Sequence, residues 1–147
     1  MMIRPATLAD IDSLFGIAIY EMRRYDLMHL KPNTEKIKKG LRHVISSAKH
    51  FCWVCVDSQD RPNGVIVGIV NENLWAQRQS CNIVLWVSDI PGEGAKLLRQ
   101  LRDWIKSRRA IKVAGFAPDT DDIDPRVWQL AEMLGFKRYG GAYLLYN

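Results

Sequence analysis

Apolar residues recur along the chain with two periods, and the order of these periods predicts one mixed α/β domain covering residues 1–147. Spacings of three and four residues predict helices at residues 7–24, 34–47, 97–105 and 124–134. Short runs rich in valine, isoleucine and aromatic residues predict strands at residues 3–6, 50–56, 65–70, 82–87, 111–117, 136–139 and 142–146. The strand at 111–117 follows its helix closely, so we expect a short crossover that leaves it parallel to the strand at 82–87.

Length and composition are those of an ordinary globular domain. The 147 residues are 48% hydrophobic and 25% charged, and no run approaches the roughly 20 apolar residues that cross a bilayer. The opening segment, MMIRPATLAD, lacks the apolar core of a signal peptide. We therefore expect a soluble cytoplasmic protein with no membrane partner.

The three cysteines, Cys52, Cys55 and Cys81, are predicted to be reduced core residues. An odd number of cysteines in a chain with enough apolar residues for a core does not indicate a disulfide framework. Cys52 and Cys55 have the spacing of a metal-binding pair, but three residues along a strand place side chains on opposite faces. No metal site is predicted.

Basic residues are concentrated on the third predicted helix and the segment after it. The net charge is +5, and the cluster runs from Lys96 to Lys112. A solvated helix face explains such a cluster, and attraction to an anionic cofactor or partner is the alternative. Nucleic acid is not the expected partner, because the basic positions are not interleaved with exposed aromatic residues.

The segment from Asn82 to Trp104 carries the clearest chemical signal. It reads NIVLWVSDIPGEGAKLLRQLRDW, a buried strand that enters an amphipathic helix through a turn with two glycines. This arrangement directs unpaired backbone N–H groups and the positive helix end at one point, which suits a phosphate group. The sequence therefore predicts a phosphate-bearing cofactor at this turn.

Three segments, IRPATLADIDSLFGI, PGEGAKLL and AEMLGFKRYGGAYLL, together with the order of elements, resemble the GNAT superfamily of acyl-coenzyme A dependent N-acetyltransferases. The resemblance covers essentially the whole chain. It implies a single-domain α/β fold with a mixed, mostly antiparallel sheet of about 6–7 strands and about four helices. Compact chains with eroded motifs also resemble acetyltransferase-like proteins of bacteriophages. The terminal strands of this fold often form dimer contacts, which makes a homodimer one expectation.

The resemblance implies that acetyl-CoA binds along the strand and turn at residues 85–95. Asp89 stands where the family has a leading basic or amide residue, Pro91 removes one N–H group, and Glu93 adds a second negative charge. Lys96 and Arg99 are the compensating cations. The predicted cofactor-binding residues are Leu85, Trp86, Val87, Ser88, Ile90, Gly92, Glu93, Gly94 and Ala95.

The catalytic groups are less clearly marked. Attack by an amine requires a base, and Glu72 is the first candidate, with Glu21 the second. The family's tyrosine that protonates the departing thiolate is replaced by Ala131, so water, Tyr139 or Tyr143 would act instead, and Tyr143 is our candidate. Asn71 and Asn73 flank Glu72 and are candidates for orienting the acceptor, whereas Trp75, Trp86 and Tyr20 line either an acceptor pocket or the core.

These observations lead to two functional hypotheses of different classes. The first is an acetyl-CoA-dependent N-acetyltransferase that transfers the acyl group directly to an amine on a small molecule or protein. The second is a GNAT-fold protein that has lost efficient catalysis and binds another protein, for example a host or virion protein. Asp89, Pro91, Glu93 and Ala131 favour the second hypothesis. An enzyme that uses a different acyl-coenzyme A is a third possibility.

Overall fold

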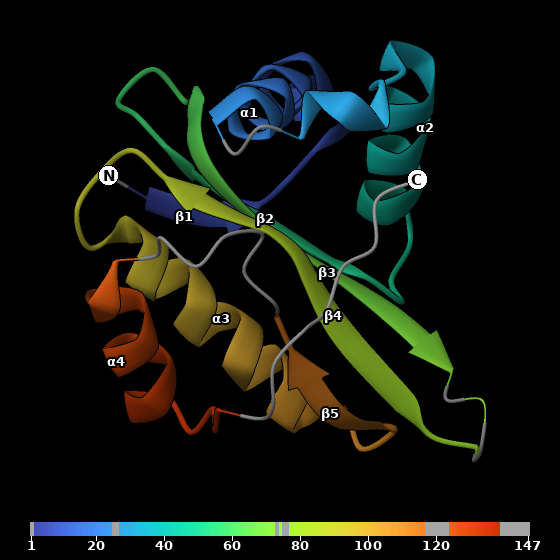
Figure 1. Cartoon of the computed structure of the whole chain (residues 1–147), viewed down its shortest axis with the longest axis vertical. Helices are drawn as coiled ribbons and strands as arrows, with labels where there is room; N and C mark the ends of the chain where they lie inside the picture. The colour runs from blue at the N-terminus through green and yellow to red at the C-terminus, as the bar shows by residue number, and fades with distance from the viewer. Residues whose placement is uncertain (1, 25–26, 73, 75–76, 117–123, 139–147) are drawn as a thin grey trace.

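The computed structural model describes residues 2–24, 27–72, 74, 77–116 and 124–138, and it is a three-layer α/β/α domain (Figure 1). A central sheet separates helices α1 and α2 on one face from α3 and α4 on the other. The α-helices are α1 (Ile11–Arg24), α2 (Thr34–Ser46), α3 (Glu93–Ser107) and α4 (Pro125–Met133), and two short 3-10 helices are η1 (Leu8–Asp10) and η2 (Met28–Leu30). The four predicted helices are thus confirmed within one or two turns at their ends.

The sheet has five strands in sequence order within the described residues. They are β1 (Met2–Pro5), β2 (Phe51–Val56), β3 (Pro62–Glu72), β4 (Gln79–Ser88) and β5 (Ile111–Gly115). Neighbouring strands are antiparallel from β1 to β4, and β5 pairs parallel to β4. The parallel pairing predicted from the short crossover is confirmed.

The predicted count of 6–7 strands is larger than the five strands found in the part of the chain that the structure describes. Residues 136–138 follow α4 without strand structure, and the predicted strand at 142–146 lies outside the described residues. The β3–β4 hairpin is longer than expected, because its polar end, which includes Asn71, Glu72, Gln79 and Ser80, is paired as strand. Asn71 and Glu72 are exposed and Gln79 and Ser80 are half-buried, so the apolar pattern of the sequence ended before the strand pairing did.

The alternation of side chains along the strands builds two cores, one on each face of the sheet. Cys55 lies in the core that α3 covers, with Phe51, Ile66 and Leu101. Cys52 lies in the core under α1 and α2. The two cysteines therefore point to opposite faces, as their spacing predicts.

All three cysteines are free and buried. Burial raises the pKa of Cys52 to about 12 and that of Cys81 to about 11, so these thiols stay protonated.

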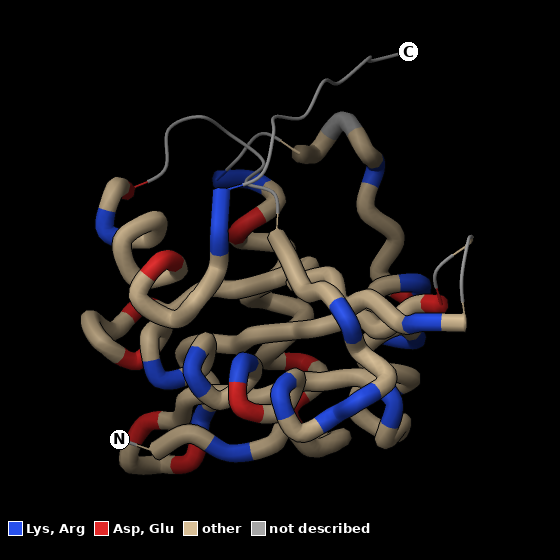
Figure 2. Tube along the Cα trace, turned by 90° about the horizontal axis from the view of Figure 1, so that it is seen from below, with Lys and Arg blue, Asp and Glu red and all other residues tan. Residues whose placement is uncertain are grey.

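Basic and acidic positions are interspersed along the chain trace (Figure 2). On α3, the Lys96 ammonium group lies 2.9 Å from Glu93, and Arg102 pairs with Asp103 at 2.9 Å. Arg108 stacks over the Trp104 ring at 4.5 Å from its centroid. Several of the clustered cations thus have local partners, which supports a solvated helix face.

No helix in the described segments is long and apolar enough to span a membrane.

Candidate functional site

The turn between β4 and α3 is fixed by hydrogen bonds of its own backbone and of Ser88. The Ser88 hydroxyl accepts the Ile90 N–H and donates to the Ile90 carbonyl, both at 3.2 Å, and the Glu93 N–H donates to the same carbonyl at 3.2 Å. Gly92 precedes the helix with φ of 88°, a left-handed conformation that glycine adopts without a steric penalty. These hydrogen bonds and the conformation of Gly92 therefore fix the backbone of the turn relative to the start of α3.

Two amide groups at the start of α3 are available for a ligand. The Lys96 N–H donates to the Gly92 carbonyl at 3.3 Å, whereas the N–H groups of Gly94 and Ala95 have no acceptor among the described residues. Both residues are partly exposed, and no side chain caps this end of α3. Free amides at a helix N-terminus, together with the helix dipole, form a site for an anionic group.

Trp86 holds this helix end against β4. Its indole Nε1–H donates to the Gly94 carbonyl at 3.0 Å, and its ring meets Phe116 edge to face at 5.7 Å between centroids. The side chain is partly buried against the core that α3 covers. Trp86 therefore belongs to the core and positions the turn, rather than lining an open acceptor pocket.

β4 and β5 separate beside this turn. Their pairing ends at Asn82 and Gly115, so among the described strands the second half of β4 pairs only with β3. A bulge leaves Val84 unpaired just after the separation, which moves the Leu85 and Val87 side chains into the α1–α2 core. The β4 backbone from Leu85 to Ser88 thus has an edge that no described strand occupies, as expected for a binding strand.

The turn carries two carboxylates, those of Asp89 and Glu93. Glu93 is 5% exposed, one of its oxygens contacts Lys96 at 2.9 Å, and the other is buried with no hydrogen-bond donor among the described residues. Asp89 is exposed, and its N–H donates to the Asn63 carbonyl at 3.3 Å. The carboxylate of Glu93 is directed into the protein and accepts no hydrogen bond from the Gly94 or Ala95 amides in the described structure, so both amides stay open.

Glu21 is the buried acidic residue that sequence reasoning undervalued. It lies on α1, is 9% exposed, and its Oε1 is 3.5 Å from an Arg24 guanidinium nitrogen. Burial raises the pKa of Glu21, Arg24 lowers it by less, and the charge of Asp89 raises it further. The sequence could have indicated this burial, because Glu21 lies seven residues after the apolar Leu14 and therefore on the same face of α1.

The two candidate bases come from different elements, β3 and α1. Glu72 is exposed and pairs in register with Gln79, at the opposite end of β4 from Ser88. Glu21 is buried on α1, and its pKa is raised by burial and, to a smaller extent, by the charge of Asp89. Ala131 is buried on α4, and Tyr139 and Tyr143 lie outside the described residues, as do Asn73 and Trp75. Tyr20 is 62% exposed, so it does not fill the core. Glu72 and Tyr143 remain predictions.

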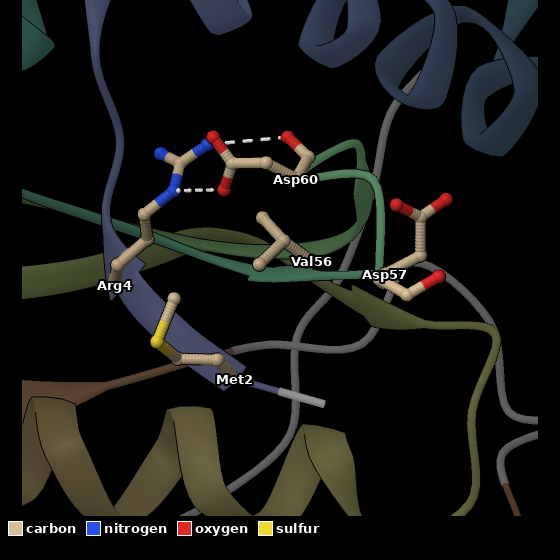
Figure 3. A pocket seen from close by; sticks show the side chains of 6 residues that line it. Met2, Arg4, Val56, Asp57 and Asp60 are labelled. Atoms are coloured by element: carbon tan, nitrogen blue, oxygen red, sulfur yellow. Dashed lines mark hydrogen bonds and ion pairs between the residues drawn. The ribbon is translucent and has the colours of Figure 1, made fainter.

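An open hollow lies between β1 and the β2–β3 turn (Figure 3) and involves none of the predicted site residues. It is lined by Met2, Arg4, Val56, Asp57, Ser58 and Asp60. Arg4 donates to Asp60 at 2.9 Å and to both carboxylate oxygens of Asp10 at 2.8 and 3.1 Å. These contacts neutralise the guanidinium group and join β1 to η1, so the arginine has a structural role.

Within the described residues, no group of three or more His, Cys, Asp or Glu side chains could hold a metal ion.

Comparison with known proteins places this geometry in a known fold. No protein-family model and no curated protein matches the sequence. Among solved structures, a probable acetyltransferase matches 100% of this chain and 98% of its own at 16% identity, with a TM-score of 0.74. A transcriptional regulator from Bacillus halodurans C-125 matches 99% of both chains at 17% identity, with a TM-score of 0.71. An aminoglycoside acetyltransferase from an uncultured soil metagenomic sample matches 99% of this chain and 97% of its own at 12% identity, with a TM-score of 0.70. The chain therefore shares the fold of these solved structures, two of which are acetyltransferases.

Proposed function

We propose that this protein is an acetyl-CoA-dependent N-acetyltransferase that transfers the acyl group directly to an amine. The observation that carries the proposal is the pair of free amides, Gly94 and Ala95, next to the unpaired half of β4. The amides suit the cofactor's pyrophosphate. The open β4 edge suits the amide-containing pantetheine arm, which binds by strand-like hydrogen bonds.

The residues would contribute mainly by positioning. With the pyrophosphate at the helix end and the arm along Leu85 to Ser88, the thioester would lie near the bulge at Val84. The amine nitrogen would form a bond to the thioester carbonyl carbon and the carbon–sulfur bond would break, while the proton that the amine loses to a base or water would be balanced by the proton that the departing thiolate takes up. Holding the two reactants in line supplies much of the rate enhancement in such a transfer.

The acceptor would approach from the sheet face that α1 and α2 only partly cover. Asn71 on β3 is paired with Ser80 on β4, and Ile69 is paired with Asn82 two residues along. Ile69 packs against the α1–α2 core, so these residues lie on the same face of the sheet. Asn82 and Val84 are exposed. One of the solved structures with this fold is an aminoglycoside acetyltransferase in complex with sisomicin. That protein supports a small-molecule amine as one class of acceptor for this chain.

A second candidate function, binding of a partner protein without efficient catalysis, has one specific observation in its favour. Asp89 and Glu93 put two carboxylates in the turn that would hold the pyrophosphate, and the carboxylate of Glu93 is buried. Like charges at this position weaken binding of an anion. A protein of this kind would keep the fold and lose the cofactor.

Thermal melting with millimolar acetyl-CoA separates the two functions. A ligand at 100 times its dissociation constant adds about 2.7 kcal/mol to the stability of the folded state. For a chain of this size, such a gain corresponds to an increase in melting temperature of roughly 5–10 °C. We expect an increase in this range, and an unchanged melting temperature would refute the enzyme proposal.

A further inference from the structure

One row of residues crosses the sheet and ends at the β4–α3 turn. Cys55 on β2 is paired with Gly64 on β3, and Gly64 is paired with Ser88, the last residue of β4. β3 lies between the other two strands (Figure 1). Neighbouring strands are about 4.8 Å apart, so side chains two strands apart do not normally touch. The Cys55 sulfur nevertheless lies 3.6 Å from the Ser88 hydroxyl oxygen.

Gly64 makes this contact possible because it has no side chain. A Cβ at this position would lie 2.3 Å from the Cys55 sulfur and 3.0 Å from the Ser88 Cα. The backbone of Gly64 is not in the left-handed region, so the glycine is not explained by its conformation. The Cys55 thiol therefore occupies the space that a side chain on β3 would fill, and it reaches across β3 to β4.

The hydrogen bonds of Ser88 decide which group donates in this contact. The Ser88 oxygen accepts the Ile90 N–H, and its single O–H donates to the Ile90 carbonyl, both at 3.2 Å. The hydroxyl then has one acceptor position left and no proton to give to the sulfur, so the Cys55 S–H is the donor. Burial raises the pKa of Cys55, which keeps the thiol protonated.

Ser88 connects this donor to the helix end where the two amides are free. The Ile90 carbonyl that accepts the Ser88 O–H also accepts the Glu93 N–H, which begins α3. A Cβ at Gly94 would lie 3.6 Å from the Ser88 Cβ, so the Ser88 side chain packs beside the first turn of this helix. The contacts from Cys55 through Ser88 and Ile90 thus form a continuous series that ends at the start of α3.

We propose that Cys55 is a positioning residue for the cofactor turn, and that it acts through Ser88 across the space left by Gly64. The proposal rests on the proposed function, in which this turn binds the pyrophosphate of acetyl-CoA. The thiol restricts the Ser88 hydroxyl to one orientation, so the Ile90 peptide and the start of α3 are in place before the cofactor binds. Such preorganisation increases affinity because less order has to be gained on binding.

Cys55→Ala tests the proposal in the free protein and with cofactor. In ¹⁵N NMR spectra of the free protein, the Ile90 and Glu93 N–H resonances should shift, because both amides donate to groups that Ser88 orients. In calorimetric titration, the variant should bind acetyl-CoA about three- to fivefold more weakly, as expected for the loss of one hydrogen bond.

Cys81→Ala is the matched control. Cys81 is as fully buried as Cys55 in the same core, and its sulfur lies 2.9 Å from the position of a Cβ on Gly68. It stands on β4 seven residues before Ser88, so it takes no part in the turn. Cys81→Ala should leave both resonances and the affinity unchanged, and the same effects in this variant as in Cys55→Ala would overturn the proposal.

A double-mutant cycle separates positioning from a merely structural role. If Cys55 acts through Ser88, Cys55→Ala should weaken binding in the wild type and have no further effect in Ser88→Ala. An equal loss in both backgrounds would refute the role of Cys55. If Cys55→Ala does not fold, Raman spectroscopy replaces it. A hydrogen-bonded S–H stretching band should then move to higher frequency in Ser88→Ala, and an unchanged band would refute the contact.

The outcomes distinguish this proposal from the proposed function. If the wild type does not bind acetyl-CoA, the proposed function is refuted, and the cofactor role of Cys55 is refuted with it. If the wild type binds acetyl-CoA and Cys55→Ala binds it equally well, the role of Cys55 alone is refuted. Weaker binding that disappears in the Ser88→Ala background supports both.

Discussion

Replacing Asp89 by glutamine tests whether the β4–α3 turn holds the pyrophosphate. Asp89 is exposed, so the water-like form of Coulomb's law applies to its side chain. Asp89 precedes the free amides of Gly94 and Ala95 by five and six residues, and we take about 7 Å as the separation between its carboxylate and an anion at these amides for use in Coulomb's law. One pair of unit charges at that separation costs about 0.6 kcal/mol in water, so two pyrophosphate charges cost about 1.2 kcal/mol.

Salt reduces this repulsion, since the Debye length at physiological ionic strength is about 8 Å. At an ionic strength of about 0.01 M, where the Debye length is about 30 Å, a gain of about 1 kcal/mol remains, which corresponds to roughly fivefold tighter binding of acetyl-CoA by Asp89→Gln. Calorimetric titration at low and high salt measures both the gain and its screening, with Glu35→Gln as the control for a change in net charge. No gain at low salt, or a loss of affinity, would show that the pyrophosphate does not bind at this turn.

Three further variants test how the structure holds the site and the sheet together. Trp86→Phe removes the 3.0 Å hydrogen bond to the Gly94 carbonyl and should destabilise the fold by about 1 kcal/mol and weaken cofactor binding; unchanged values in chemical unfolding and titration would contradict this role. Gly64→Ala would place a Cβ 2.3 Å from the Cys55 sulfur and 2.8 Å from the Val87 carbonyl oxygen, so urea unfolding should show a loss of about 2–3 kcal/mol, and a neutral effect would rule out this close approach. Asp10→Asn removes a carboxylate whose pKa burial raises but the hydrogen bonds from Arg4 and Thr7 lower by more, so that it falls below its usual value. The stabilisation from Asp10 is therefore present at neutral pH and lost as the pH falls through this lowered pKa, so the variant should lose about 2 kcal/mol at pH 7 and much less at pH 2, and an equal loss at both would refute the assignment.

The framework of the fold could be predicted because its signals are local. Helical stripes such as Leu97, Leu98 and Leu101 are determined by the helix repeat alone. The opposite orientation of Cys52 and Cys55 follows from the two-residue repeat of a strand. The cap of α4 by Asp124 likewise follows from the hydrogen bond that an aspartate side chain accepts at a helix start.

The parts that the sequence did not predict depend on contacts between distant segments. The bulge at Val84 exists only relative to β3, and it decides that Leu85 rather than its neighbours faces the α1–α2 core. The burial of Glu21 depends on how α1 packs over the sheet, which its own segment does not determine. The end of the β4–β5 pairing at Asn82 is likewise a property of two strands together. Local patterns contain none of this information.

Nuclear magnetic resonance of the ¹⁵N-labelled protein tests the central claim most directly, because it observes the two free amides individually. On titration with acetyl-CoA, we expect the Gly94 and Ala95 N–H resonances to shift in a saturable way, together with those of the unpaired β4 edge from Leu85 to Ser88. Coenzyme A binding that leaves Gly94 and Ala95 unshifted, or the absence of any shift at millimolar cofactor, would contradict the account.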